Sequence, residues 1–381
     1  MGRSRNGRER AGISLIDVAR AAGVSTATAG RALGGYGYAS LAVAERVRAA
    51  AKTLGYRPNR LARSLITGRT QTIGVVASDI ASPFYSAVIR GVADAIQARG
   101  FGVIVTNSDE RLPLEQQAVR LLLEKQVDGI IIAPCELASP KHLAEAVASG
   151  CPVVQVDRAA LGLRADSITV DNVGAARACI RALTEAGHRR IGFVGELIME
   201  EPADLEDVIR RCAKLSPGEH GVAPSLLRLN GYLAGCRDAG IATDPHLIRR
   251  LGLYSAAAAR AAVLDLIGSP RPPTALFTSD GAMSTGAMEA IAALELDIPD
   301  DLSLVCFDDL DWMQFYGRGV TAASQPAREI GGQAADLLLR RIEGDREPPR
   351  HIILPVPLSM RRSIAPPRRG SAKAGRTMGA G

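Results

Sequence analysis

The chain has 381 residues, of which 47% are hydrophobic and 23% charged, enough for two or three globular domains. Its six cysteines and five histidines are scattered without the spacing of a disulfide framework or a metal site, and no apolar run has the length of a signal peptide or membrane span. We therefore expect a cytoplasmic protein with reduced cysteines, no membrane segment, no bound metal and no cofactor.

The net charge of +6 is unevenly distributed. Residues 1–70 contain thirteen Lys and Arg against three acids, whereas residues 71–363 contain 29 basic and 37 acidic residues. A basic end on an acidic body favours a polyanionic partner at that end. The basic residues of the expected disordered tail, 1–12, either contact that partner or are simply solvated.

Residues 13–33 have the pattern of two short helices joined by a tight turn. Ser14 is a good N-cap, and Leu15, Val18, Ala19 and Ala22 recur at the spacing of one buried helical face. Gly23 breaks this helix, and Ser25 can cap a second helix of small residues that runs to residue 33. Small side chains let such a helix sit deep in the DNA major groove, although the pattern also fits an ordinary pair of antiparallel helices.

A third helix is predicted over residues 41–54, capped by Ser40 and ended by Gly55, which completes a small headpiece over residues 13–58. Residues 59–70 then form a basic hinge segment. Two helical turns over residues 60–66 are too short to be stable alone. They need a second copy of themselves or DNA as a partner; otherwise the segment is a linker.

From residue 71 to residue 363, short β-branched runs alternate with amphipathic helical segments. Strands buried on both faces and separated by helices favour parallel doubly wound sheets, here two Rossmann-like lobes. The carboxyl ends of their strands are expected to meet at one crevice, which is the usual ligand site of open α/β sheets.

Three stretches carry a family resemblance: IDVARAAGVSTATAGRAL, ERVRAAAKTLGYRPNRLARSL and TIGVVASDIASPFY. Together they resemble the LacI/GalR (lactose-repressor) family of transcription regulators, over roughly residues 13–364. The resemblance implies an all-α helix-turn-helix headpiece and an α/β periplasmic-binding-protein-like effector domain. It also implies double-stranded operator DNA and a small-molecule effector as partners, and no catalytic residues.

In that family the second helix reads the major groove, and paired hinge helices insert a leucine into the minor groove. By motif position this implies base contacts from Thr26, Ala27 and Arg31, phosphate contacts from Ser25 and Thr28, and Leu65 as the wedge. The complete set of expected DNA contacts is Ser25, Thr26, Ala27, Thr28, Arg31, Tyr38, Asn59, Ala62, Arg63 and Leu65. Arginine can donate bidentately to guanine, and an apolar wedge allows bent DNA to wrap more protein. Gly30 departs from the family's usual serine, which removes one phosphate-binding hydroxyl.

The same resemblance implies that the chain passes between the lobes three times. It divides the body into an N-lobe of residues 71–172 and 325–350 and a C-lobe of residues 173–324 and 351–363. The expected effector contacts, all near strand ends, are Asp79, Phe84, Tyr85, Asp157, Arg158, Tyr254, Ser279, Asp280, Asp308 and Gln325. Carboxylates and aromatic rings suit a sugar or other polyol, and a nucleobase would also fit. Asp308 is the strongest candidate, because an acid directly after a buried strand has little structural purpose. Phe84 could equally be a core residue.

Two segments depart from the family pattern. Residues 196–226 form a longer insertion with a helix expected over residues 204–215, which either covers the crevice or, as we slightly favour, decorates the surface. The tail, residues 364–381, is low in complexity and expected to be disordered. It lacks leucine heptads, so we expect a homodimer rather than a tetramer.

The sequence therefore predicts a DNA-binding repressor whose operator affinity is controlled by a small molecule. A solute-binding protein would share the body but would need a signal peptide and no basic headpiece. An enzyme on a doubly wound sheet is disfavoured, because the chain has no glycine-rich phosphate loop, catalytic triad spacing or metal motif.

Overall fold

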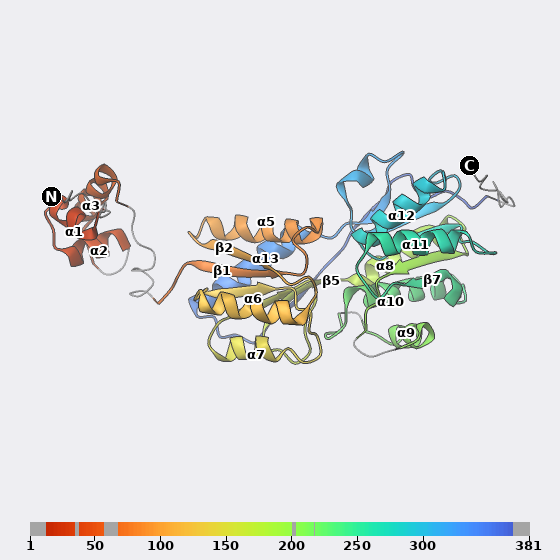
Figure 1. Cartoon of the computed structure of the whole chain (residues 1–381), viewed down its shortest axis with the longest axis horizontal. Helices are drawn as coiled ribbons and strands as arrows, with labels where there is room; N and C mark the ends of the chain where they lie inside the picture. The colour runs from red at the N-terminus through yellow and green to blue at the C-terminus, as the bar shows by residue number, and fades with distance from the viewer. Residues whose placement is uncertain (1–12, 35–37, 57–67, 200–202, 217, 369–381) are drawn as a thin grey trace, which may run out of the picture. The chain divides into compact units, whose positions relative to one another are not determined.

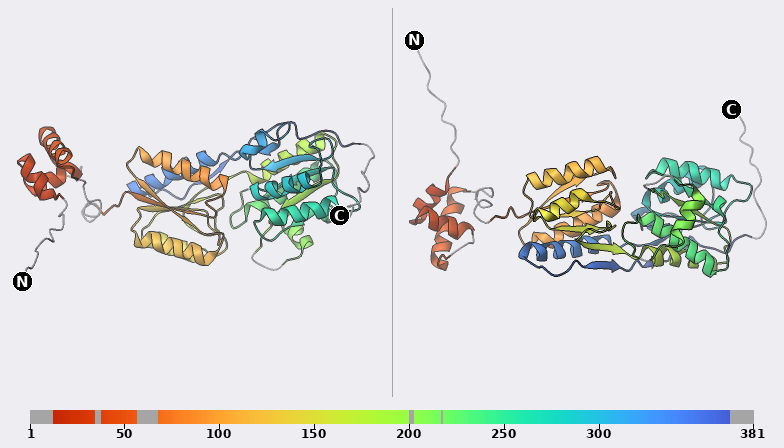
Figure 2. Two further views of the ribbon diagram at one scale, coloured as in Figure 1. Left: turned by 45° about the horizontal axis from the view of Figure 1, so that its top comes forward. Right: turned by 90° about the horizontal axis from the view of Figure 1, so that it is seen from below.

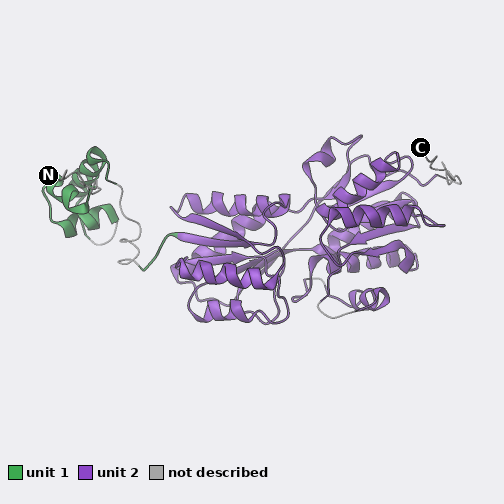
Figure 3. Ribbon diagram, viewed as in Figure 1, with its two compact units in different colours: residues 1–71 green, residues 72–381 purple. Residues whose placement is uncertain are grey.

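The computed structural model describes residues 13–34, 38–56, 68–199, 203–216 and 218–368. The chain forms two compact units, Met1–Gln71 and Thr72–Gly381, which are described separately (Figure 3). None of the described helices is long and apolar enough to cross a membrane.

The first unit contains three helices, α1 (Leu15–Ala22), α2 (Thr26–Gly34) and α3 (Leu41–Leu54). Ser14 and Asp17 form a reciprocal capping box at the start of α1, and Gly23 ends the helix with φ 62°. The core is built from small residues, with Val18, Ala29 and Val47 completely buried. The three helices expected from the sequence are thus confirmed. The hinge helix expected over residues 60–66 lies outside the described residues.

In the described part of the second unit, the strands form two six-stranded sheets, one in each lobe. The first sheet has the order β11-β5-β4-β3-β1-β2, and all of its strand pairs are parallel. Its strands are β1 (Thr72–Ala77), β2 (Gly102–Asn107), β3 (Gly129–Ile132), β4 (Val153–Val156), β5 (Asp166–Val170) and β11 (His351–Leu354). One face packs on α5 (Pro83–Gln97) and α13 (Ala327–Glu343), and the other on α6 (Leu112–Glu124) and α7 (Lys141–Ala148).

The second sheet has the order β12-β10-β9-β8-β6-β7, with β12 antiparallel to β10. Its strands are β6 (Ile191–Gly195), β7 (Ile248–Arg250), β8 (Ala275–Thr278), β9 (Ser303–Phe307), β10 (Thr321–Ala323) and β12 (Leu358–Ser359). The helices α8 (Asn172–Glu185) and α10 (Pro224–Asp238) cover one face, and α11 (Ala256–Ile267) and α12 (Gly281–Ala293) cover the other. Figures 1 and 2 show both lobes as sheets between layers of helices.

The chain passes between the lobes three times, after β5, after β10 and between β11 and β12. The first two crossings lie where the sequence predicted them. The third corrects the predicted division, because residues 351–354 pair with β5 in the first sheet and only the later part of 351–363 belongs to the second lobe. Strand β11 is half-exposed at an edge, so its pattern alone does not tell which sheet it joins.

The insertion at residues 196–226 contains α9 (Leu205–Cys212), capped by Asp204 and packed through Val208 and Cys212 on the second lobe's core. Its distal part reaches the first lobe. Gly221 donates its backbone N–H to Ala159 O at 2.8 Å, and the rings of His220 and His351 lie 4.5 Å apart. The expectation that this segment only decorates the surface is therefore wrong.

Candidate functional site

The exposed side of α2 in the first unit presents all three of the predicted base-reading residues. Thr26, Ala27 and Arg31 are exposed, while Ala29 and Ala32 point into the core. The Ser25 hydroxyl accepts from Thr28 N at 3.1 Å and lies 2.8 Å from the Thr28 hydroxyl, so these two residues fix the start of the helix. Ser25 thus caps the helix, as the sequence predicted.

The remaining predicted DNA contacts divide between described and undescribed residues. Tyr38 is 87% exposed just before α3. Asn59, Ala62, Arg63 and Leu65 lie outside the described residues, and their roles stay predictions.

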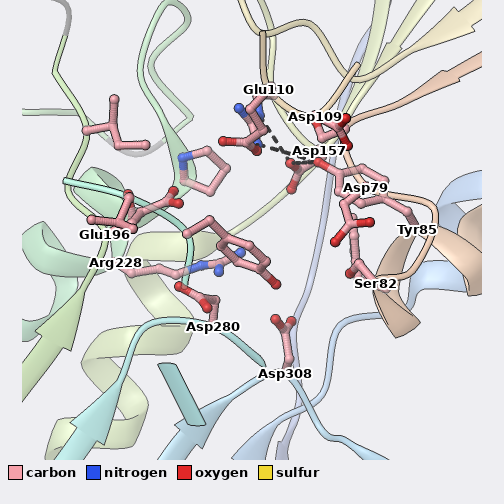
Figure 4. A pocket seen from close by; sticks show the side chains of 18 of the residues that line it. Asp79, Ser82, Tyr85, Asp109, Glu110, Asp157, Glu196, Arg228, Asp280 and Asp308 are labelled. Carbon is pink, nitrogen blue, oxygen red and sulfur yellow. Dashed lines mark hydrogen bonds and ion pairs between the residues drawn. The ribbon is translucent and has the colours of Figure 1, made fainter. Parts of the chain in front are cut away.

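The second unit contains a cavity of about 410 Å³ lined by residues from both lobes (Figure 4). Nine of the ten predicted effector contacts line it. The lining residues are Ser78, Asp79, Ser82, Phe84, Tyr85, Asp109, Glu110, Asp157, Arg158, Glu196, Ile198, Pro224, Ser225, Arg228, Gly252, Leu253, Tyr254, Asp280, Asp308 and Gln325. The tenth, Ser279, is fully buried behind the wall and donates its hydroxyl to Asp280 Oδ2 at 2.8 Å. Ser279 is therefore not part of the wall, and its role as an effector contact stays a prediction.

The cavity forms where parallel strands end, as expected for open α/β sheets. Asp157 follows β4 directly and Asp308 follows β9 directly, with φ 68° and 70°. Asp109 and Glu110, after β2, also have positive φ. Non-glycine residues seldom adopt this conformation, and it occurs mainly where the surrounding structure imposes it. The turns at these strand ends bring the acidic residues to the cavity wall.

The first lobe contributes a buried network of one arginine, two acids and a phenol. Asp157 Oδ2 accepts from the Tyr85 hydroxyl at 2.8 Å and from Arg158 Nε at 3.3 Å, and Arg158 Nη2 donates to Glu110 Oε1 at 2.7 Å. Burial, followed by the Asp157 charge, raises the pKa of Tyr85 well above its usual value. Tyr85 is therefore a neutral donor, and Arg158 is already engaged by protein carboxylates.

The position of Phe84 is compatible with both of the roles that the sequence left open. It lines the cavity, and it also packs partly on the first lobe's core, with its ring 5.0 Å from that of Tyr85 in an edge arrangement.

On the second lobe, Arg228 is buried and held in place by other protein groups. Its Nε donates to Asn172 Oδ1 at 2.8 Å, its Nη1 donates to Ser279 O at 2.7 Å, and its guanidinium carbon lies 3.8 Å from the centre of the Phe307 ring. A stacked, doubly hydrogen-bonded guanidinium is a rigid wall element.

Asp280 and Asp308 lie beside this arginine (Figure 4). Asp280 caps α12 by accepting from Ala282 N and Met283 N, each at 3.0 Å. Asp308 accepts from Gly281 N at 3.1 Å and from Gln325 Nε2 at 2.6 Å. Gln325 lies at the second crossing between the lobes, so Asp308 connects the cavity directly to a crossing segment.

Three acidic residues of the cavity, Asp109, Glu110 and Glu196, are absent from the predicted effector contacts, and Glu196 is the most unusual of them. It is buried, and burial, with added repulsion from Asp280 and Glu110, raises its pKa to about 7. Burial likewise raises the pKa of Asp280 to about 6. The two carboxyl groups influence each other across one wall of the cavity.

Several other wall residues were missed for a recognisable reason. Glu196 and Ser225 lie at the two ends of the insertion, where no family motif guides the assignment. Arg228 was missed as well, because the sequence alone does not show that this charged residue of α10 is buried beside Asn172 and Ser279. Among the described residues, no group of three or more His, Cys, Asp and Glu is arranged to hold a metal ion.

Comparison with known proteins agrees with this architecture. Residues 14–59 match the bacterial regulatory proteins of the lacI family, and residues 180–364 match the periplasmic binding protein-like domain. The chain is 31% identical over 331 residues to the HTH-type transcriptional repressor CytR of Escherichia coli strain K12, covering 87% of this chain and 90% of the relative.

Two solved structures are similar over nearly the whole chain. The lac repressor dimer bound to operator and the anti-inducer ONPF has a TM-score of 0.75 at 26% identity, covering 93% of this chain and 99% of that chain. The complex of the transcriptional regulator CelR with cellobiose has a TM-score of 0.62 at 29% identity, covering 92% and 99%. With its helix-turn-helix headpiece and two-lobed α/β body, the chain belongs to the lacI family of bacterial DNA-binding transcriptional regulators.

Proposed function

We propose that the protein is a homodimeric repressor that binds a palindromic operator and changes its affinity when a small molecule occupies the cavity of its body. The observation that carries this proposal is the position of the cavity. It is lined by both lobes and by Gln325 at a crossing segment, so a ligand that contacts both lobes has different contacts in open and closed arrangements. In this proposal the repressor acts in the cytoplasm, where the bacterial DNA lies.

On the DNA side, we assign base contacts to Thr26, Ala27 and Arg31 and phosphate contacts to Ser25 and Thr28. The exposure of Arg31 and the capping geometry of Ser25 support this assignment. Two or three reading residues per headpiece recognise only a few base pairs, so specificity requires two headpieces on one operator. Pairing of the hinge segments, with Leu65 as the wedge, supplies that coupling in the proposal.

On the ligand side, we propose a compact polyol of the sugar class. Phe84 and Tyr254 offer ring faces, and Asp157 and Asp308 offer acceptors for adjacent hydroxyl groups. The similarity to a regulator solved with cellobiose supports the same class. A nucleobase is the second candidate, because the same rings can stack on it.

The DNA assignment can be tested with an operator recovered by in vitro selection from random duplexes on the full-length chain. Arg31→Ala should weaken binding to that operator by about tenfold or more, because one bidentate base contact contributes roughly 1–3 kcal/mol per headpiece. Arg48→Ala, an equal charge change on the exposed side of α3, is the control and should cost much less. Equal losses for both variants would show that Arg31 acts only through its charge.

The effector assignment can be tested by thermal-shift screening of the same chain against neutral sugars, amino sugars and nucleosides. A stabilising compound should change operator affinity in a gel-shift titration, and Asp308→Ala should remove both the stabilisation and the change in affinity. A compound that stabilises the chain and never changes operator affinity would argue against effector control.

A further inference from the structure

The cavity has a strong excess of negative charge. Seven carboxylates line it, against two guanidinium groups: Asp79, Asp109, Glu110, Asp157, Glu196, Asp280 and Asp308 face only Arg158 and Arg228. Neither arginine is free to balance a further acid. Arg158 is paired with Glu110 and Asp157, and Arg228 donates to Asn172 and Ser279 O.

Six of the seven carboxylates nevertheless have partners within the described protein. Asp79 accepts from Ala81 N at 2.8 Å and Asp109 from the Asn107 side chain. Glu110, Asp157, Asp280 and Asp308 accept the hydrogen bonds described above. These acids hold loops and helix starts in place, so their charges have structural roles even when the cavity is empty.

The carboxylate of Glu196 is different. Its Oε2 is buried without a hydrogen-bond partner among the described residues, and no ion pair involves it there. Arg158 and the Ser225 hydroxyl are close enough to lower its pKa, but Arg158 forms no ion pair with it, and the Ser225 hydroxyl is itself without a hydrogen bond of normal geometry. A buried carboxylate without a partner is costly, and its neighbours Asp280 and Glu110 add to that cost.

A positively charged ligand group would stabilise the ionised form of Glu196, and it would have to fit beside the hydroxyl-binding groups of the cavity. No metal-holding cluster is found among the described residues. A neutral sugar would fill the space without balancing the charge. A primary ammonium group offers three donors to Glu196, to the nearby Ser225 hydroxyl and to Asp280.

We propose that the effector is an amine-bearing polyol of the amino-sugar class, whose ammonium group pairs with Glu196 while its hydroxyl groups donate to Asp157 and Asp308. This inference rests on the proposed function, since it names the ligand class of the same cavity. In this proposal Glu196, on the second lobe, recognises the positive charge of the ligand. Asp157 and Asp308, at two strand ends, recognise its hydroxyl groups.

Matched pairs of sugars test the inference on the full-length chain. Glucosamine and galactosamine are compared with glucose, galactose and N-acetylglucosamine by thermal shift at pH 6.5 and constant ionic strength. We expect at least one aminated sugar to stabilise the chain by several degrees and its neutral counterparts to have a smaller effect. Equal or greater stabilisation by the neutral sugars, or no shift with either aminated sugar, overturns the inference.

A charge-neutral variant then locates the contact. Glu196→Gln should weaken binding of the stabilising aminated sugar by about tenfold or more, because one partner of a buried charged pair is removed. The affinity for neutral sugars should stay nearly unchanged. Glu206→Gln makes the same charge change at an exposed position of α9 and should behave like the parent. An equal effect of both substitutions on the aminated sugar contradicts the pairing.

Calorimetry on the unsubstituted chain provides a second readout that does not depend on any variant folding. With a pKa of about 7, Glu196 is largely protonated at pH 6.5 without ligand and must release its proton to pair with an ammonium group. Titrations in two buffers of different ionisation enthalpy should therefore show about three quarters of a proton released per aminated sugar. Proton uptake, or none exchanged, overturns the inference.

Operator binding by the same preparations distinguishes a failure of the repressor proposal from a failure of the amino-sugar inference. If the chain binds operator and a neutral sugar changes that affinity, the repressor assignment stands and the amine inference fails. If the chain binds an aminated sugar through Glu196 but no selected duplex, the ligand class stands and the repressor proposal fails.

Discussion

The acidic residues at strand ends show how single positions shape this cavity. Asp157 and Asp308 each follow a fully buried strand and have φ near 70°. Such a conformation costs of the order of 1–3 kcal/mol at a non-glycine residue and is kept only where neighbouring contacts impose it. Their carboxylates are held by Tyr85, Arg158, Gly281 and Gln325, so a ligand meets acceptors that are already in position.

Glu196 makes a specific contribution to the pH dependence of stability. Its pKa is raised from 4.5 to about 7 in the folded protein, so the folded state retains this proton where the unfolded state has lost it. The group's contribution is therefore fully favourable below about pH 4.5 and is lost as the pH rises to about 7, by an amount on the order of 1–3 kcal/mol. We expect the parent to lose stability relative to Glu196→Gln between pH 5 and pH 8 when both are unfolded in urea without ligand.

The comparison of the two proteins at each pH cancels the titration of groups that do not interact with Glu196, such as the buried His188. A stability difference that does not change across this range would mean that Glu196 is already ionised at pH 5.

At the scale of elements, glycines allow the helices of each lobe to approach closely. A side chain at Gly331 of α13 would place its Cβ 1.9 Å from Val88 O, and one at Gly91 of α5 would lie 2.0 Å from Arg328 O. The same backbone contact recurs at Gly286, between α12 and α11. These helix pairs pack backbone to backbone, and α13 is thereby fixed against the first lobe directly after the second crossing.

Two adjacent glycines of α13 offer a matched test of this packing. Gly331→Ala should destabilise the body by roughly 1–3 kcal/mol, since α5 cannot move away without opening the core. Gly332→Ala meets no atom within 4 Å and should be neutral or stabilising by up to about 1 kcal/mol, because alanine favours helix. Thermal or urea unfolding of both variants gives the comparison. Similar stabilities of the two variants would show that α5 and α13 can move apart to accept a methyl group at little cost in free energy.

The hinge segment is the other element on which the proposed mechanism depends. Leu65→Ala should weaken operator binding by about tenfold or more, because the inserted leucine stabilises the kinked base step of the bound DNA. Effector affinity should stay unchanged, because Leu65 has this contact only in the complex with DNA. Ile66→Ala removes a similar apolar side chain from the neighbouring position and is the control. Gel-shift titration with the selected operator distinguishes them. Equal operator affinity for Leu65→Ala and the parent would contradict the wedge assignment.

At the scale of the whole molecule, the sequence predicted the order of helices and strands better than it predicted which lobe or cavity wall each one belongs to. Regular alternation of buried strands and helices predicted two doubly wound lobes, and the argument that an acid after an apolar strand has little structural purpose singled out Asp308, which lines the cavity. Asp157 and Ser279 came from the family resemblance; Asp157 lines the cavity, whereas Ser279 lies buried behind it, because motif position does not show which way a side chain points. Glu196 and strand β11 were missed or misassigned because an insertion and an edge strand have no repeating pattern to follow.

The oligomeric state is also a property of the whole molecule. We expect sedimentation equilibrium to give a dimer for the full chain and also for a chain ending at residue 368, because the last residues contain no leucine heptads that could form a tetramer-making helix. A tetramer that becomes a dimer on truncation would show that the tail assembles by a pattern the sequence does not reveal.

The three crossings also bear on the order in which the molecule forms during synthesis. Helix α13 and strand β11, at residues 327–354, complete the first lobe, although its other strands lie before residue 171. Most of the second lobe is continuous from residue 172 to residue 323 and emerges from the ribosome in one piece. We therefore expect the first lobe to remain incomplete, with the α5 glycine surface uncovered, until nearly the whole chain has been made. The lobe translated first is thus completed only at about residue 354, after the segment that carries Gln325, and the second lobe is completed by β12 a few residues later.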